Sequence, residues 1–236
     1  MRNIILKVPR FIQPKMECAP TALNQIFSYY GLNIELKDLI KRCETKIKYK
    51  DWEYKAASVA LDEGFKVDIY STSLELFDPS WFKISRNKLI NKLNKRLKFV
   101  LKSNKSDWRN GYIKYWHEDA IKETVNFLEN GGNIKFDLFN EKMIYNILSR
   151  KIPILVCFLD VNLFYCYKRK YNNKYNDIKG MNFGHSVVVS GYKNNKFIIT
   201  DSGKKCPNKS GIYSVLPDKL LTSILRYDGE LVSIHK

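Results

Sequence analysis

The amino-acid sequence predicts an α+β fold in which an N-terminal helical lobe packs on a C-terminal antiparallel sheet. In the first part of the 236-residue chain, apolar side chains mostly recur every three or four positions, which is helical spacing. After about residue 150, short apolar runs bounded by turn residues predict strands. Neither a repeat nor a linker divides the chain, and 44% hydrophobic residues suffice for one core. We therefore expect one domain over residues 1–236, with a helical lobe over about 1–150 and a β-rich lobe over about 151–236.

The first expected helix follows a short loop and begins near Cys18. Apolar residues at 19, 22, 23, 26, 27 and 30 give it one packing face. Pro20 suits the first turn of a helix and Gly31 suits its end. Free N–H groups at a helix start favour a thiolate, and Gln13 supplies an amide donor just upstream. A lone cysteine at a helix start is more often a small buried residue, so a nucleophile here requires a base elsewhere in the chain.

The remaining elements of the first 150 residues follow the same spacing rule. We expect helices over residues 34–43, 53–63, 86–102, 118–129 and 140–151. Residues 65–70 alternate apolar and polar side chains and predict a strand. Residues 103–117 show no clear period and are expected to be irregular, and the basic helix over 86–102 is expected to present its lysines to solvent.

The last third is expected to form the sheet. We expect strands over residues 152–159, 186–192, 196–200, 212–216 and 231–235, with a short helix over 217–225. Asn194 and Asn195 suit a tight turn between two of these strands. Residues 160–183 are expected to form a long polar-aromatic loop, which suits either a lid beside an active site or base stacking.

A histidine and an aspartate mark this expected hairpin. His185 stands directly before the first strand, and Asp201 follows the second strand sixteen residues later. In a tight hairpin these two positions lie side by side, so a carboxylate can orient the imidazole. Alone, His185 is equally well explained as a packed edge residue and Asp201 as a turn former. Together with Cys18 they favour a nucleophilic site.

Both segments resemble the papain-like cysteine peptidases of the bacteriocin-processing, double-glycine leader peptidase type. The resemblance lies in Gln13 and the Cys-Ala-Pro-Thr run at residues 18–21, which opens a helix ending in Tyr-Tyr-Gly. It lies equally in the run from Gly184 to Tyr192 and in the Phe-Ile-Ile-Thr-Asp run at residues 197–201. The order Cys, His, Asp also matches. The middle of the chain resembles the stand-alone bacterial and archaeal relatives.

The resemblance implies a papain-like fold, no cofactor, and a peptide or protein substrate. It implies that Cys18 is the nucleophile, His185 the general base and acid, and Asp201 the orienting residue. Gln13 and the Cys18 backbone N–H would donate to the oxyanion. The implied activity is peptide-bond hydrolysis through a thioester, with limited specificity for a peptide or protein tail.

The site residues depart from the family pattern at three positions, of which the Gln13 spacing and Ala19 favour a binding module without catalysis, whereas the change at Ser202 is expected to be harmless. Gln13 lies five residues before Cys18, where the family usually has six, Ala19 replaces the usual Gly, and Ser202 stands where Pro is common. Acyl transfer or deamidation would use the same thioester with a different acceptor or leaving group. A non-catalytic peptide- or anion-binding module would use only the groove.

Composition indicates which kinds of site, location and partner to expect. The cysteines at 18, 43, 157, 166 and 206 are odd in number and irregularly spaced, and the three histidines are scattered, so we expect neither a disulfide framework nor a metal site. Without a membrane-length apolar run or a secretory signal, a cytoplasmic location is expected. The formal net charge of +17 leaves nucleic acid or another anionic partner open, although no nucleic-acid motif accompanies it.

Overall fold

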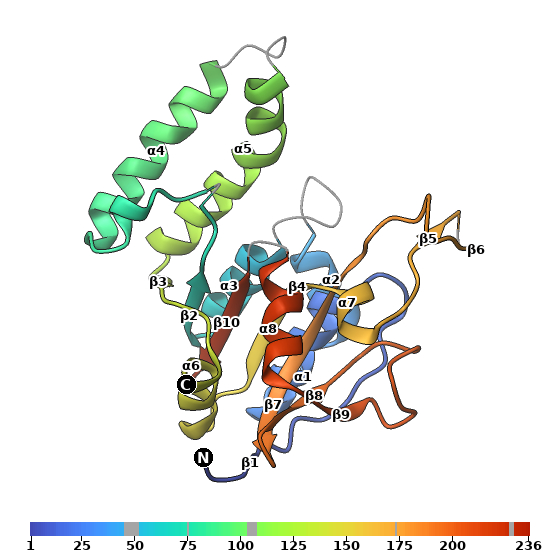
Figure 1. Cartoon of the computed structure of the whole chain (residues 1–236). Coiled ribbons are helices and arrows are strands. Elements are labelled where there is room, and N and C mark those ends of the chain that lie inside the picture. The colour runs from blue at the N-terminus through green and yellow to red at the C-terminus, as the bar shows by residue number, and fades with distance from the viewer. Residues whose placement is uncertain (45–51, 75, 103–107, 173, 227–228) are drawn as a thin grey trace.

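The computed structural model describes residues 1–44, 52–74, 76–102, 108–172, 174–226 and 229–236. Within this part, the side chains of residues 52, 53 and 108–117 lie outside the description. The chain forms a mostly antiparallel sheet with helices packed against it (Figure 1), as the α+β prediction requires.

The main sheet has eight strands in the order β3-β2-β10-β4-β7-β8-β9, with β1 paired to β7. Its strands are β1 (Ile4–Ile5), β2 (Lys66–Ser71), β3 (Asn133–Phe136), β4 (Ile154–Asp160), β7 (Gly184–Lys193), β8 (Lys196–Thr200), β9 (Ile212–Val215) and β10 (Glu230–His235). Among these pairs, β2 and β3 run parallel and the others run antiparallel. The expected β-rich lobe thus continues into strands from the first 150 residues.

The helices are α1 (Cys18–Tyr29), α2 (Leu36–Arg42), α3 (Trp52–Asp62), α4 (Arg86–Lys102), α5 (Trp108–Glu129), α6 (Glu141–Ser149), α7 (Val161–Tyr165) and α8 (Pro217–Leu225), and a 3₁₀ turn covers Pro79–Trp81. Helix α1 packs on β7 and β4, and α3 packs on β2 and β10. Helix α8 also packs on β4 and lies in front of the sheet in Figure 1, with α1 behind it. Helices α4 and α5 form a hairpin that projects from the sheet (Figure 1).

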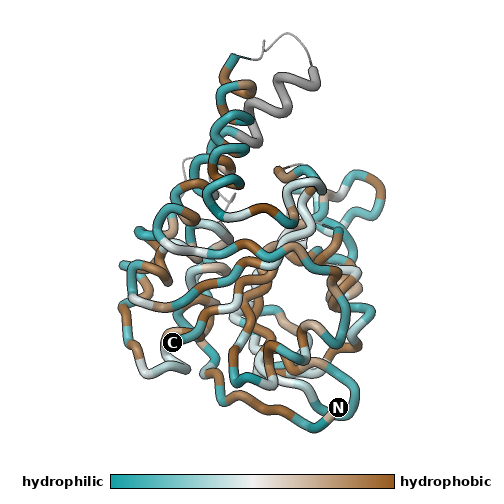
Figure 2. Tube along the Cα trace, turned by 90° about the vertical axis from the view of Figure 1, so that its left-hand side faces the viewer, coloured by the Kyte–Doolittle hydropathy of each residue, from teal (hydrophilic) through white to brown (hydrophobic). Residues whose placement is uncertain are grey.

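Apolar side chains from the central strands and from α1 form the core. The strands β4 and β7 are buried along most of their length because helices cover both of their faces. Figure 2 shows hydrophobic residues concentrated along these central segments. Fully buried members of this core include Leu23, Ile26, Phe27, Leu155, Val156, Val187, Val188 and Val232. The rigid core therefore carries both α1, which begins at Cys18, and β7, which begins beside His185.

Three local expectations need correction. Helix α5 begins at Trp108, so residues 108–117 are helical rather than irregular, because pairing with α4 stabilises a helix that periodicity alone does not predict. Residues 103–107 of that stretch lie outside the described residues. Strand β3 was not expected, since four residues give too short a pattern to recognise without its partner β2.

Residues 160–183 are also more ordered than the expected loop. They contain the short helix α7 and a separate hairpin of β5 (Lys170–Tyr171) and β6 (Lys174–Tyr175). The side chain of Asp160 caps α7 by accepting hydrogen bonds from two backbone N–H groups, at 2.9 Å from Asn162 and 3.0 Å from Leu163. This capping explains why the chain turns sharply at the end of β4.

Candidate active site

Cys18 is the first residue of α1, as the spacing predicts, and it is half-buried. The preceding residue, Glu17, makes no side-chain cap. The geometry of an α-helix leaves the first N–H groups without partners inside the helix, so the Cys18 N–H is free of an intrahelical bond. Since α1 packs on β7, this end of the helix lies against the strand that carries His185.

His185 and Asp201 are direct neighbours and both are buried. His185 is the second residue of β7, opposite Leu159 of β4, and Asp201 directly follows β8. His185 Nε2 lies 2.9 Å from Asp201 Oδ1. Since Nε2 is engaged by the carboxylate, Nδ1 is the ring nitrogen left for another partner.

That other partner is Cys18, whose sulfur shares a hydrogen bond with His185. Burial of the sulfur opposes ionisation, but the hydrogen bond and charge of His185 and hydrogen bonds from the Ser186 side chain and backbone outweigh it. Together they lower the pKa of the Cys18 thiol below 9.0. Burial acts to lower the pKa of His185, but hydrogen bonds to Asp201 and Cys18 raise it from 6.5 to about 10. Both shifts favour a thiolate beside an imidazolium.

Asp201 accepts hydrogen bonds on both carboxylate oxygens. Besides His185, the backbone N–H of Gly203 donates to Oδ1 at 2.7 Å. Tyr213 donates to Oδ2 at 2.6 Å, and the Tyr165 hydroxyl donates to the same oxygen. Burial acts to raise the pKa of Asp201, but the hydrogen bonds and charge of His185 and the two tyrosine hydroxyls lower it. The carboxylate is therefore held ionised.

Arg10 fastens the loop that carries Asp201 to the N-terminal segment. Its guanidinium donates to three backbone carbonyls, at 3.0 Å to Asp201, 3.1 Å to Gly203 and 3.2 Å to Lys209. These bonds join residues about 190 positions apart in the sequence. Arg10 thus links the segment before Cys18 to the loop after β8 through hydrogen bonds that do not involve the side chains of Cys18, His185 or Asp201.

Gln13 lies in the same network, with its side chain held at both ends. Its backbone N–H donates to the Ser202 carbonyl at 2.9 Å, and its Oε1 accepts from the Ser202 hydroxyl at 2.9 Å. Its Nε2 donates to the Lys15 carbonyl at 2.8 Å. One N–H of the amide is therefore used within the loop, and donation by the other to an oxyanion stays a prediction.

Sequence reasoning did not assign several residues around the site, among them Arg10, Tyr165, Ser186 and Tyr213. Ser186 directly follows His185 in β7, and because successive side chains of a strand point to opposite faces, adjacency alone does not place its side chain beside the sulfur. Tyr165 belonged to an expected loop and Tyr213 to an expected strand, and neither position carries a motif. Their contact with Asp201 depends on how α7 and β9 are placed around β8.

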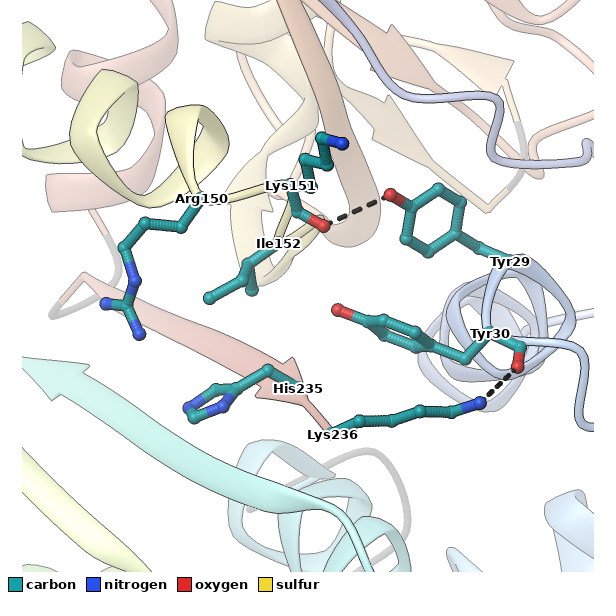
Figure 3. A pocket seen from close by; sticks show the side chains of 7 residues that line it. All are labelled: Tyr29, Tyr30, Arg150, Lys151, Ile152, His235 and Lys236. Atoms are coloured by element: carbon teal, nitrogen blue, oxygen red, sulfur yellow. Dashed lines mark hydrogen bonds between the residues drawn. The ribbon is translucent and has the colours of Figure 1, made fainter.

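A separate pocket lies at the opposite end of α1, about 16 Å along the helix axis from Cys18. It has a volume of about 590 Å³ and is lined by Tyr29, Tyr30, Arg150, Lys151, Ile152, His235 and Lys236 (Figure 3). The Tyr29 hydroxyl donates to the Lys151 carbonyl, and Lys236 Nζ donates to the Tyr30 carbonyl (Figure 3). None of the four candidate site residues lines it.

Among the residues that the structure describes, no cluster of three or more His, Cys, Asp or Glu side chains could hold a metal ion. Over the same residues, no helix is both long and apolar enough to cross a bilayer. The site itself brings together the thiol of Cys18, the imidazole of His185 and the carboxylate of Asp201.

Comparison with known proteins identifies the family of this chain. Among curated proteins, none is similar enough to count as a match. Among solved structures, a candidate C39-like peptidase from Bacillus anthracis is similar at 12% identity, over 100% of this chain and 98% of that one, with a TM-score of 0.48. The model of the Peptidase_C39 like family matches residues 5–215, which is most of the chain. The chain therefore belongs to the Peptidase_C39 like family of cysteine peptidases.

Proposed function

We propose that the protein hydrolyses peptide bonds by nucleophilic catalysis at Cys18, with His185 and Asp201 completing a catalytic triad. The observation that carries this proposal is the continuous chain of contacts from the Cys18 sulfur through His185 to Asp201, with 2.9 Å between the last two residues. Membership of the peptidase family supports a peptide substrate. Limited specificity for a peptide or protein tail remains part of the proposal.

Each residue has a defined role in the proposed reaction. The Cys18 thiolate attacks the carbonyl carbon, and the His185 imidazolium gives its proton to the nitrogen of the departing amine. The C–N bond breaks and a thioester links the acyl group to Cys18. His185 then takes a proton from water, whose oxygen attacks the thioester, and the acid leaves with the thiolate and imidazolium restored. Asp201 stays ionised and orients the imidazole throughout.

Two donors would stabilise the oxyanion of each tetrahedral intermediate. The backbone N–H of Cys18 is available because it lies at the start of α1. The second would be the Gln13 amide, which is fixed by Ser202 on its oxygen side. Its remaining N–H would have to point toward the carbonyl oxygen of the substrate when substrate is bound.

Competitive labelling of the five cysteines tests the activated thiol. Brief treatment with substoichiometric iodoacetamide at about pH 6.5, followed by peptide mass spectrometry, should modify Cys18 first. Cys166 is the internal control because it is exposed, whereas Cys18 is half-buried. Preferential reaction at Cys18 would therefore reflect thiolate character rather than accessibility.

The matched variant is His185→Ala, which removes the partner of the thiolate but leaves Cys18 in place. It should reduce the labelling rate of Cys18 by about tenfold or more, while the labelling rate of Cys166 stays unchanged. Labelling of Cys18 no faster than Cys166 in the unaltered protein would refute the activated thiol. Hydrolysis is then tested with a mixed peptide library, where cleavage must be lost in Cys18→Ala.

A further inference from the structure

The hydroxyl groups of Tyr165 and Tyr213 meet on one oxygen of a buried carboxylate. Tyr213 lies on β9 and donates to Asp201 Oδ2 at 2.6 Å, and Tyr165, at the end of α7, donates to the same atom. Asp201 itself is fully buried. The opposite oxygen, Oδ1, faces His185. The two tyrosines therefore bind the carboxylate oxygen of Asp201 that points away from the imidazole.

This arrangement has two physical consequences. With two donors on each oxygen, rotation of the Asp201 carboxylate about its side-chain bond would break four hydrogen bonds, so its direction toward His185 is fixed. The hydroxyls also draw negative charge toward Oδ2, which weakens the hold of Oδ1 on the imidazole proton. Burial and the neighbouring carboxylate raise the pKa of both tyrosines, so both hydroxyls stay protonated donors at neutral pH.

We propose that Tyr165 and Tyr213 are positioning residues, which aim Asp201 at His185 and limit how tightly the imidazole holds its proton. The inference deepens the proposed function, because a general acid must release its proton to the leaving amine within each turnover. An unmoderated carboxylate would stabilise the imidazolium too strongly for that step. The tyrosines act through Asp201 and do not touch the sulfur in this role.

Among the described residues, the ionisable groups that act directly on His185 belong to two residues. Cys18 faces the ring from α1, and Asp201 faces it from the end of β8. The ring of Tyr165 lies 6.1 Å from the imidazole, centroid to centroid. Near the carboxylate, the Arg10 guanidinium donates to backbone carbonyls. Its Nη2 lies 3.8 Å from the Cys206 sulfur. Removing one tyrosine hydroxyl thus changes the field at His185 without removing a formal charge.

The test is the titration of His185 by NMR in protein labelled with ¹³Cε1-histidine. The chain has three histidines, and the signal of His185 is identified by its absence in His185→Asn. Tyr213→Phe and Tyr165→Phe each keep the ring and delete only the hydroxyl. Each should move the high-pH titration of His185 upward by about half a pH unit, and the double variant by more than either single variant.

Tyr167→Phe is the matched control. Tyr167 lies two residues after Tyr165 and its ring packs on Tyr165, but its hydroxyl donates to the Lys205 carbonyl at 3.3 Å instead of reaching Asp201. This variant should leave the titration of His185 unchanged. Circular dichroism checks whether each variant is folded. If one of the two tyrosine variants does not fold, the titration of His185 in the other variant still tests the proposal.

The outcomes separate this inference from the proposed function. An unmoved or lowered titration in folded Tyr165→Phe and Tyr213→Phe overturns the positioning role, even if Cys18 remains selectively reactive. An upward shift supports that role even if no peptide is cleaved, because the titration requires neither substrate nor turnover. A shift of equal size in Tyr167→Phe would also overturn it, since the effect would then come from general loosening of the segment.

Discussion

Nε2 of His185 lies 2.9 Å from Oδ1 of Asp201, although the two residues stand on opposite sides of a hairpin. The turn at Asn194 and Asn195 makes this possible, since both residues adopt the left-handed conformation, with φ of 52° and 57°. The strands return close together, and Asp201 comes back beside the start of β7. The buried Asp201 carboxylate is therefore placed to interact directly with the His185 ring.

Replacement of Asp201 by Asn should therefore lower the pKa of His185 from about 10 and weaken the thiolate of Cys18. Labelling of Cys18 by iodoacetamide at about pH 6.5 should fall at least tenfold, by order of magnitude. The Asn amide would also turn N–H groups toward a tyrosine hydroxyl or toward the N–H of Gly203, which should cost about 1–3 kcal/mol of unfolding free energy.

The control for this substitution is Asp137→Asn, which makes the same chemical change at an exposed carboxylate. It should leave the labelling rate of Cys18 unchanged. It should change the unfolding free energy by no more than about 0.5 kcal/mol. If Asp201→Asn labels Cys18 as fast as the unaltered protein does, the carboxylate does not support the ion pair.

The pH dependence of stability should show a plateau that belongs to the Cys18–His185 pair. The folded pKa of His185 is raised from 6.5 to about 10, so its contribution is complete below 6.5 and is lost as pH rises toward about 10. The folded pKa of Cys18 is lowered, so its contribution is complete above 9.0 and is lost as pH falls through the lowered value. At pH values above both 6.5 and the lowered pKa of Cys18, the two effects cancel up to pH 9.0.

Counting protons gives the same result. Above the lowered pKa of Cys18, the folded pair holds one proton as thiolate and imidazolium, whereas the unfolded chain holds one between pH 6.5 and 9.0 and none above. Once Cys18 is ionised, the contribution of the pair should stay level with pH up to 9.0 and then fall. The measurement is unfolding by guanidinium chloride, with reductant, in the unaltered protein and in Cys18→Ala/His185→Ala. A difference that declines steadily from pH 6.5 upward would mean that the thiol stays protonated.

Much of the fold could be predicted because its longer segments carry their own periodicity. The limits of α4 and β8 coincide with the expected 86–102 and 196–200, and those of β7 differ from expectation by one or two residues. Short elements were missed or left undefined, as with β3 and α7, because a few residues contain too little pattern. Their structure depends on partners, namely β2 for β3 and the Asp160 cap for α7.

The same distinction applies to the site. The proximity of His185 and Asp201 follows from a tight hairpin, which the local sequence encodes. The contacts of Tyr165 and Arg10 with the Asp201 region span 36 and 191 positions, and no local pattern encodes them. The hydrogen bonds of Gln13 to Lys15 and Ser202 likewise depend on loop conformation, which the sequence leaves open.

Replacement of Gly211 by Ala should lower the unfolding free energy, because Gly211 lies against the Arg10 side chain. At Gly211, where φ is +66°, an added Cβ would lie 2.0 Å from Arg10 Nε. Gly31 is the matched control, with φ of +82° and no atom within 4 Å of such a Cβ. Gly31→Ala should cost about 1 kcal/mol from backbone conformation alone. Gly211→Ala should cost about 1–3 kcal/mol more, because Arg10 must leave the carbonyls it now binds.

This pair of variants also has a readout at the site. Gly211→Ala should slow labelling of Cys18 several-fold, since displacement of Arg10 releases the backbone that positions Asp201. Gly31→Ala should leave the labelling rate unchanged, because Gly31 follows the opposite end of α1. Equal losses of stability in the two variants would show that the Arg10 contacts contribute little.

Gln13→Ala should separate two reactions of the same sulfur. Alkylation by iodoacetamide forms no oxyanion, so its rate should stay within about twofold of the unaltered protein. Acylation of Cys18 by p-nitrophenyl acetate passes through a tetrahedral oxyanion, and its rate should fall by about 100-fold if the Gln13 amide donates to it. Mass spectrometry measures both adducts at Cys18.

Ser202→Ala is the companion variant, since it removes the hydroxyl that holds Gln13 Oε1 but keeps the amide itself. Its acylation rate should fall less than that of Gln13→Ala, because the amide is less well oriented but still present. Acylation unchanged in Gln13→Ala would place the second oxyanion donor elsewhere. Equal loss of acylation and alkylation would instead mean that Gln13 holds the loop around Cys18, through Lys15 and Ser202, rather than the oxyanion.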